Sequence, residues 1–162
     1  MERRRNLAGV IDEVGNHIVA IQEAHIGQLQ VLDRWNFVCE RDQFIACRKP
    51  STIETIAGGA EEHKCWWHVA DVRLDKPRLG LKNVVVMSLH LNNVVAKKPV
   101  AGPDCLGRAI NSALQQLRNG RLPSVDIICG DLNGACGKDA TLGVLKSCRL
   151  IPVALWSGAC CS

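Results

Sequence analysis

Short, largely apolar runs that end in polar side chains are the feature of this chain that most constrains its fold. The runs are Ile18–Ile21 before Gln22 and Glu23, 84–87 before His90 and Asn92, and 125–129 before Asp131 and Asn133. Runs of this kind are typical of strands that are buried on both faces of a sheet. The strands would hold the backbone while the following loops expose the polar side chains, which is how sites are commonly built.

The rest of the chain mixes helix and strand periodicities. Helical spacing predicts helices over 4–14, 28–35, from Pro103 to Gly120, and 141–148. Further strands are predicted over 37–39, 43–47, 52–56, 64–74, 83–91 and 150–155. We expect a turn at Gly58-Gly59 and Glu61-Glu62, a hairpin between 64–74 and 83–91, and a polar loop over 92–102. This mixture indicates an α/β or α+β class, with helices on the outer faces of sheets.

Composition fits a single globular domain over residues 1–162 and excludes several other classes. Hydrophobic residues make up 47 % and charged residues 22 %, so wholesale disorder is not expected. No apolar run approaches the length of a membrane span. The formal charge of +4 is compatible with a phosphate-bearing partner but does not by itself indicate one. Nothing in the sequence indicates an oligomeric state.

The nine cysteines are an odd number and are not accompanied by a signal peptide or a glycosylation sequon. We therefore expect an intracellular, reducing compartment, cytoplasmic or nuclear, with mostly free thiols. The cluster from His63 to His68 lacks a second half at zinc-finger spacing, so alternation along a strand explains it better.

The polar clusters at the strand ends suit phosphate chemistry. Glu23, Asp131 and Asn133 offer hard oxygen atoms, and Mg²⁺ needs only one or two carboxylates besides water and substrate phosphate. His90 could donate a hydrogen bond to a phosphoryl oxygen. Each cluster alone has an ordinary explanation, because Asp-x-Asn is common in turns and a single Glu or His is often structural. Their order and spacing together favour a site.

The same residues resemble the motifs of the endonuclease/exonuclease/phosphatase superfamily, the relatives of DNase I. Ile18–Ile21 with Gln22-Glu23 is similar to the family's Gln-Glu motif, and 85–91 is similar to its central strand ending in His-Leu. The run Asp126-Ile127-Ile128-Cys129-Gly130-Asp131-Leu132-Asn133 resembles its Gly-Asp-x-Asn motif. The similarity covers about residues 4 to 150, in the family's order.

The resemblance implies a DNase I-like four-layer α/β sandwich, truncated at both ends, that acts as a metal-dependent phosphodiesterase or phosphoester hydrolase. It implies Mg²⁺ (or Mn²⁺) at Glu23, and catalytic roles for His90, Asp131 and Asn133. We expect Asn92 to contact the substrate phosphate. Nucleic acid is the expected substrate, although DNA, RNA, phosphoinositides and nucleotides all stay open because one fold supports many substrates.

Two departures from the family pattern lead us to expect impaired activity. The family's opening strand with a metal-site Asn and its closing Ser-Asp-His motif are not found, and the last histidine here is His90. We expect a fragment, a truncated product or a degraded copy, since losing one member of a catalytic unit costs orders of magnitude in rate. There is no tyrosine, which excludes branches with a catalytic Tyr.

Two alternatives compete with this hypothesis. A non-catalytic pseudoenzyme or binding module that retains the fold is the first. A calcineurin-like metallophosphatase is the second, but its Gly-Asn-His element should come late in the chain, whereas Gly15-Asn16-His17 comes early.

Overall fold

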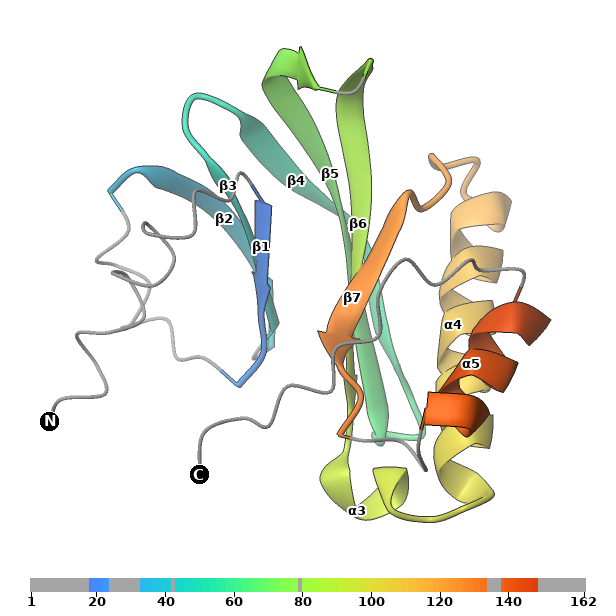
Figure 1. Cartoon of the computed structure of the whole chain (residues 1–162). Coiled ribbons are helices and arrows are strands. Elements are labelled where there is room, and N and C mark those ends of the chain that lie inside the picture. Colours follow the sequence, from blue (N-terminus) through green and yellow to red (C-terminus); the bar gives the residue numbers. More distant parts are fainter. Residues whose placement is uncertain (1–17, 24–32, 42, 79, 134–137, 149–162) are drawn as a thin grey trace, which may run out of the picture.

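The computed structural model describes residues 18–23, 33–41, 43–78, 80–133 and 138–148 (Figure 1). The described strands are β1 (Ile18–Ile21), β2 (Trp35–Glu40), β3 (Gln43–Arg48), β4 (Thr52–Glu61), β5 (Cys65–Arg78), β6 (Leu81–Leu91) and β7 (Ile127–Asp131). The described helices are α3 (Asn93–Ala96), α4 (Ala101–Asn119) and α5 (Lys138–Ser147). The chain is thus of the mixed α/β class that the sequence predicts, and most of its regular structure is strand. None of these helices is both long and apolar enough to cross a membrane.

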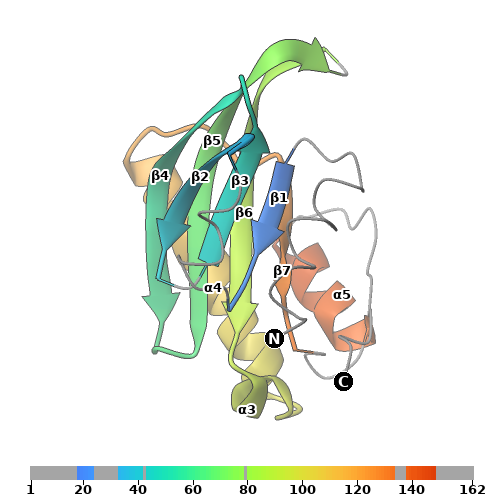
Figure 2. The same ribbon diagram turned by 90° about the vertical axis from the view of Figure 1, so that its left-hand side faces the viewer.

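The strands form two sheets. The first has three strands in the order β1-β3-β2, all antiparallel. The second has four strands in the order β4-β5-β6-β7, in which β4, β5 and β6 are antiparallel and β7 runs parallel to β6. The parallel connection from β6 to β7 passes through α4, as such a crossover requires. Figure 2 shows the two sheets lying face to face, with the three-stranded sheet in front.

Side-chain alternation along the strands divides the core into layers. Ile45, Cys47, Ala70, Val72 and Val86 pack together between the two sheets. The opposite face of the four-stranded sheet packs against α4, the helix that lies along it in Figure 1. The outer face of the three-stranded sheet is also apolar and buried, through the residues Trp35, Phe44 and Ala46.

Strand β6 is the centre of this arrangement. Its residues 84–91 are all buried, because even-numbered side chains face the other sheet and odd-numbered ones face α4. Val84 and Val86 lie in the cluster between the sheets, while Met87 and Leu89 lie in the cluster under α4. The prediction that a continuous apolar run forms a strand buried on both faces is therefore confirmed for β6. It was wrong for the other two runs, because β1 is only half-buried and Ile127 of β7 is 48 % exposed. Both strands stand at the end of their sheet in the described part of the chain.

Two local predictions were wrong. Gly58 and Gly59 do not form a turn but lie inside β4, which extends to Glu61. Gly59 is needed there because a Cβ at this position would lie 2.6 Å from the Trp67 ring. The expected loop over 92–102 contains helix α3, whose first turn is capped by the Asn92 side chain. It also contains the first residues of α4, which begins at Ala101.

The predicted helix over 4–14, most of the one over 28–35 and the strand over 150–155 lie outside the described residues. Trp35, the last residue of that second segment, begins β2. The other predicted strands and helices are confirmed with bounds shifted by a few residues. The helical spacing of leucine and isoleucine predicts one buried face for α4, and this face is buried at Leu106, Ile110 and Leu117 and half-buried at Leu114.

Between the sheets the interior changes from apolar to polar towards one end. Here Gln22, Glu40 and Gln43 of the three-stranded sheet face His68 and Ser88 of the four-stranded sheet, and we call these five residues the polar layer. Gln43, His68 and Ser88 are at most 1 % exposed. His68 shares a 2.9 Å hydrogen bond with the Thr55 hydroxyl through Nε2. Burial lowers the pKa of His68, an effect that the nearby Glu40 carboxylate opposes.

The lowered pKa of His68 predicts a pH-dependent stability. Because the folded-state pKa lies below the ordinary value of 6.5, the unfolded chain takes up a proton first as the pH falls. The free energy of unfolding should therefore decrease as the pH falls through 6.5 towards the folded-state pKa. His68→Gln should lose less stability than the wild type between about pH 8 and about pH 5 in urea unfolding.

The matched control is His63→Gln, because His63 is exposed in the turn before β5. This variant should keep the wild-type pH dependence. An unchanged pH dependence in His68→Gln would show that the buried imidazole does not cause it.

Candidate active site

The strand ends predicted to carry a site meet at one end of the sandwich. In the four-stranded sheet, His90 on β6 pairs with Trp66 on β5 and with Asp131 on β7. All three lie on the face turned towards the other sheet. Glu23 follows β1 in that other sheet, and its Oε1 lies 3.4 Å from Nε2 of His90. Residues far apart in the sequence thus converge from both sheets.

Glu23 and His90 differ strongly in exposure. The Glu23 side chain is 70 % exposed, whereas the His90 side chain is 7 % exposed. The His90 ring also contacts the Trp66 ring, with centroids 5.6 Å apart. The Glu23 backbone adopts a positive φ of 56°, which turns the chain away from the strand direction immediately after Gln22. The site therefore presents an accessible carboxylate above a buried imidazole.

Asp131 and Asn133 form a tight turn at the end of β7. The backbone N–H of Asn133 donates a 2.8 Å hydrogen bond to Oδ1 of Asp131. The Asn133 side-chain Nδ2 donates a 2.7 Å bond to the carbonyl of Leu91, which anchors this turn to the end of β6. Asn133 has a positive φ of 49°, a conformation that asparagine tolerates better than most residues. The turn explanation of Asp-x-Asn is therefore confirmed, and a role of these two residues in a site stays a prediction.

Asn92 has a structural role in the described structure. Its Oδ1 accepts a 2.9 Å hydrogen bond from the backbone N–H of Val94 and so caps α3. Its own backbone N–H donates to the carbonyl of Lys64 at 2.7 Å. Contact between Asn92 and a phosphate stays a prediction, and it would have to use the side-chain amide N–H groups.

The donor set suits a weakly held divalent cation better than a closed metal cage. Among the described residues no group of three His, Cys, Asp or Glu side chains is arranged to hold a metal. Glu23 contacts His90 from the other sheet, and Asp131 is the neighbour of His90 in the register of β6 and β7. One or two carboxylates are enough for Mg²⁺, which retains several water molecules and takes further oxygen ligands from substrate phosphate.

A shallow groove runs beside the site between the two sheet edges. It has a volume of about 330 Å³ and is lined mainly by β1 and β7. Its lining residues are Ile18, Ala20, Gln22, Val86, Ile127, Cys129 and Gly130. In the described part of the chain, β1 pairs only with β3 and β7 pairs only with β6. The groove therefore opens along two sheet edges, and its lining includes Gln22 and Gly130, the residues before Glu23 and Asp131.

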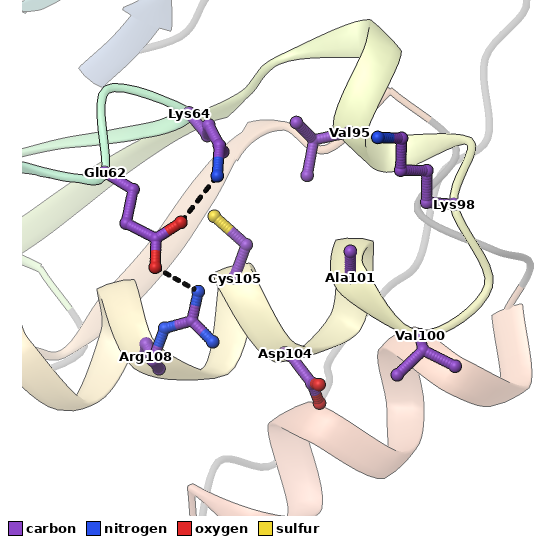
Figure 3. Close-up of a pocket in the computed structure, with 9 residues that line it drawn as sticks. All are labelled: Glu62, Lys64, Val95, Lys98, Val100, Ala101, Asp104, Cys105 and Arg108. Atoms are coloured by element: carbon purple, nitrogen blue, oxygen red, sulfur yellow. Dashed lines mark hydrogen bonds and ion pairs between the residues drawn. The ribbon is translucent and has the colours of Figure 1, made fainter.

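A second hollow, of about 270 Å³, lies at the start of α4 (Figure 3). Two of its cations are already paired, because Glu62 binds Lys64 at 2.6 Å and Arg108 at 3.0 Å. The hollow also contains Val95 and Cys105 of the cluster under α4, on the opposite face of the four-stranded sheet from His90. It is therefore separate from the candidate active site.

Sequence reasoning missed two residues of the site region. Trp66 contacts His90, and Ser88 binds Gln22 beneath it. Strand alternation could have found both, because Trp66 and His68 occupy one face of β5, and Ser88 and His90 occupy the same face of β6.

Neither protein-family models nor a search of curated proteins gave a match to this chain.

Gly130 fixes how close β7 comes to β6, and this generates a prediction. Its φ is +148°, and a Cβ at this position would collide with the carbonyl oxygen of Leu89. Gly130→Ala should lower the free energy of unfolding by about 2 kcal/mol or more, because backbone cannot yield as a side chain can. Urea unfolding followed by circular dichroism would measure the change.

Gly143→Ala is the matched control, because Gly143 lies in α5 with open space around its Cα. Alanine favours a helix over glycine by about 1 kcal/mol, so this variant should be as stable as the wild type or more stable. Equal stability of Gly130→Ala and the wild type would contradict the close approach of the two strands.

Proposed function

We propose that this chain is a metal-dependent phosphodiesterase of the endonuclease type, built on a DNase I-like sandwich. The observation that carries the proposal is the convergence of Glu23, His90 and Asp131 from three strands of two sheets. The 3.4 Å approach of Glu23 to His90 and the pairing of His90 with Asp131 bring together groups that the sequence separates by more than a hundred residues. This convergence is what the resemblance to the superfamily leads us to expect of a working site.

Each residue has a role that its surroundings permit. The exposed Glu23 carboxylate would hold Mg²⁺ or Mn²⁺ from the three-stranded sheet. The cation would polarise a phosphoryl oxygen of the substrate and offset the charge that develops on it. Asp131, at the end of β7, would orient the attacking water or accept its proton. His90 would donate a hydrogen bond to the phosphate, and the Asn133 turn would keep Asp131 in place.

The class of substrate follows from the shape of this end of the molecule. The Glu23 carboxylate lies exposed at an open edge between two sheets, and an open site suits an extended phosphodiester better than a small enclosed ligand. The net charge of +4 also suits a polyanion. We propose nucleic acid as the substrate on this basis, while other phosphodiesters share the same chemistry at the phosphate.

A non-catalytic role is the second candidate, and one observation favours it. Asp131 and Asn133 are both engaged in hydrogen bonds that stabilise their own turn, and Asn92 caps α3. These contacts give the residues a reason to persist in a protein that binds a partner without cleaving it. Such a protein would retain the sandwich and the cation-binding carboxylate but would lack turnover.

Magnesium titration and plasmid cleavage test the proposal. The purified chain should bind Mg²⁺ in calorimetry and should nick supercoiled DNA only when the cation is present. Glu23→Ala should abolish cation binding, and Asp131→Ala should slow nicking by about 100-fold or more, as loss of a group that acts on the transition state does.

Glu54→Ala is the matched control for both variants. Glu54 is an exposed carboxylate that pairs with Arg73 at 2.7 Å, towards the other end of β4 from the site. It should leave binding and nicking unchanged. Cation binding without nicking would favour the non-catalytic candidate, and absence of both would contradict the proposal.

A further inference from the structure

The residues immediately beneath the candidate active site form a polar layer inside the sandwich. Moving along β6 on the face turned to the other sheet, Val84 and Val86 are followed by Ser88 and then by His90. Along the same face of β1, Ile18 and Ala20 are followed by Gln22, directly before Glu23. Polar side chains therefore replace apolar ones in both sheets just before the site.

One hydrogen bond in the polar layer joins the two sheets. The Gln22 side-chain Nε2 donates to the Ser88 hydroxyl at 2.8 Å. Ser88 is completely buried, and Gln22 is half-buried. A hydrogen bond that ties a buried hydroxyl to a partly buried amide resists breaking, because the hydroxyl would lose its partner away from water. This hydrogen bond therefore holds the end of β1 against β6.

The Glu23 side chain itself does little to fix where its carboxylate lies. This side chain is 70 % exposed, and a polar contact with so much exposure contributes little to holding two groups together. Gln22, in contrast, is hydrogen-bonded to Ser88, which lies two positions before His90 on the same face of β6. The chain then turns through the positive φ of Glu23 and brings the carboxylate to the imidazole.

We propose that Gln22 is a positioning residue that acts through Ser88 to place the Glu23 carboxylate against His90. The inference rests on the proposed function for its importance in catalysis, but the geometry that it claims can be tested separately. Ser88 accepts the hydrogen bond from Gln22, and it lies on β6, the strand that carries His90. Groups that orient a metal-binding residue without touching the metal commonly change affinity or rate by about 10-fold to 100-fold.

The test measures whether the ring resonance of His90 still responds to a change at Glu23 when the hydrogen bond between Gln22 and Ser88 is removed. In the full chain with ¹³C-labelled histidine, the ring resonance of His90 is assigned by its loss in His90→Gln. Glu23→Gln should shift this resonance in the otherwise wild-type chain. In a Ser88→Ala background, the same Glu23→Gln change should shift it several-fold less.

Two further variants keep the test decisive. Gln22→Leu removes the donor instead of the acceptor, so it should reproduce the effect if Ser88→Ala fails to fold. Val72→Ala loosens the packing between the sheets without touching the bond, so it should leave the response to Glu23→Gln intact. A response of equal size in all backgrounds, or no response in the wild type, would overturn the positioning role.

Activity gives the second readout. If the chain nicks DNA with Mg²⁺, Ser88→Ala should lower the affinity for Mg²⁺ or the rate of nicking by about 10-fold, and Val72→Ala should not. An unchanged affinity and rate in Ser88→Ala would overturn the catalytic part of the inference. Spectroscopic coupling in a chain that neither binds Mg²⁺ nor nicks DNA would support the positioning geometry and contradict the proposed function.

Discussion

Burial of β6 on both faces is the constraint on which the rest of the structure depends. Residues 84–91 face the three-stranded sheet on one side and α4 on the other, so both layers take their position from this strand. β7 pairs with β6 in parallel, and the backbone of Gly130 lies against Leu89. The groups of the candidate site are placed by their relation to β6. Trp66 and Asp131 lie on strands that pair with it, and Asn133 binds the carbonyl of Leu91. Glu23 reaches His90 from the other sheet.

The interior of the sandwich changes in character along this strand. Apolar packing between the sheets gives way to the polar layer and then to the exposed carboxylate of Glu23. Buried polar groups cost free energy unless they are hydrogen-bonded, so a layer of this kind restricts the sheets to one relative position more strongly than apolar contacts do. The bond between Gln22 and Ser88 serves this purpose, because it joins the two sheets, while the bond between Thr55 and His68 ties β4 to β5 within one sheet. The layer therefore links the stable core to a site that needs accurate placement.

The sequence predicted the strands and helices around the site because their apolar periodicity is strong. Ile18–Ile21, the run that includes Val86, and the α4 stripe with Leu106 and Ile110 were all found in this way. The turn predicted at Gly58 and Gly59 was wrong because glycine usually marks a turn, whereas here side chains of neighbouring strands take the space of a Cβ. The contact of Glu23 with His90 could not be derived from periodicity, since it depends on how two sheets stack. The polar side chains at the strand ends favoured a site, and the resemblance to a known family suggested a role for each of them, but neither predicted this contact.

The most direct test of the account is an anomalous diffraction map from crystals of the chain soaked in Mn²⁺. The account predicts a single strong peak beside the Glu23 carboxylate, on the side that faces Asp131 and His90. A peak elsewhere, or no peak at a concentration that saturates Mg²⁺ sites of ordinary affinity, would contradict the claim that the two sheets meet to form a cation-dependent phosphodiesterase site.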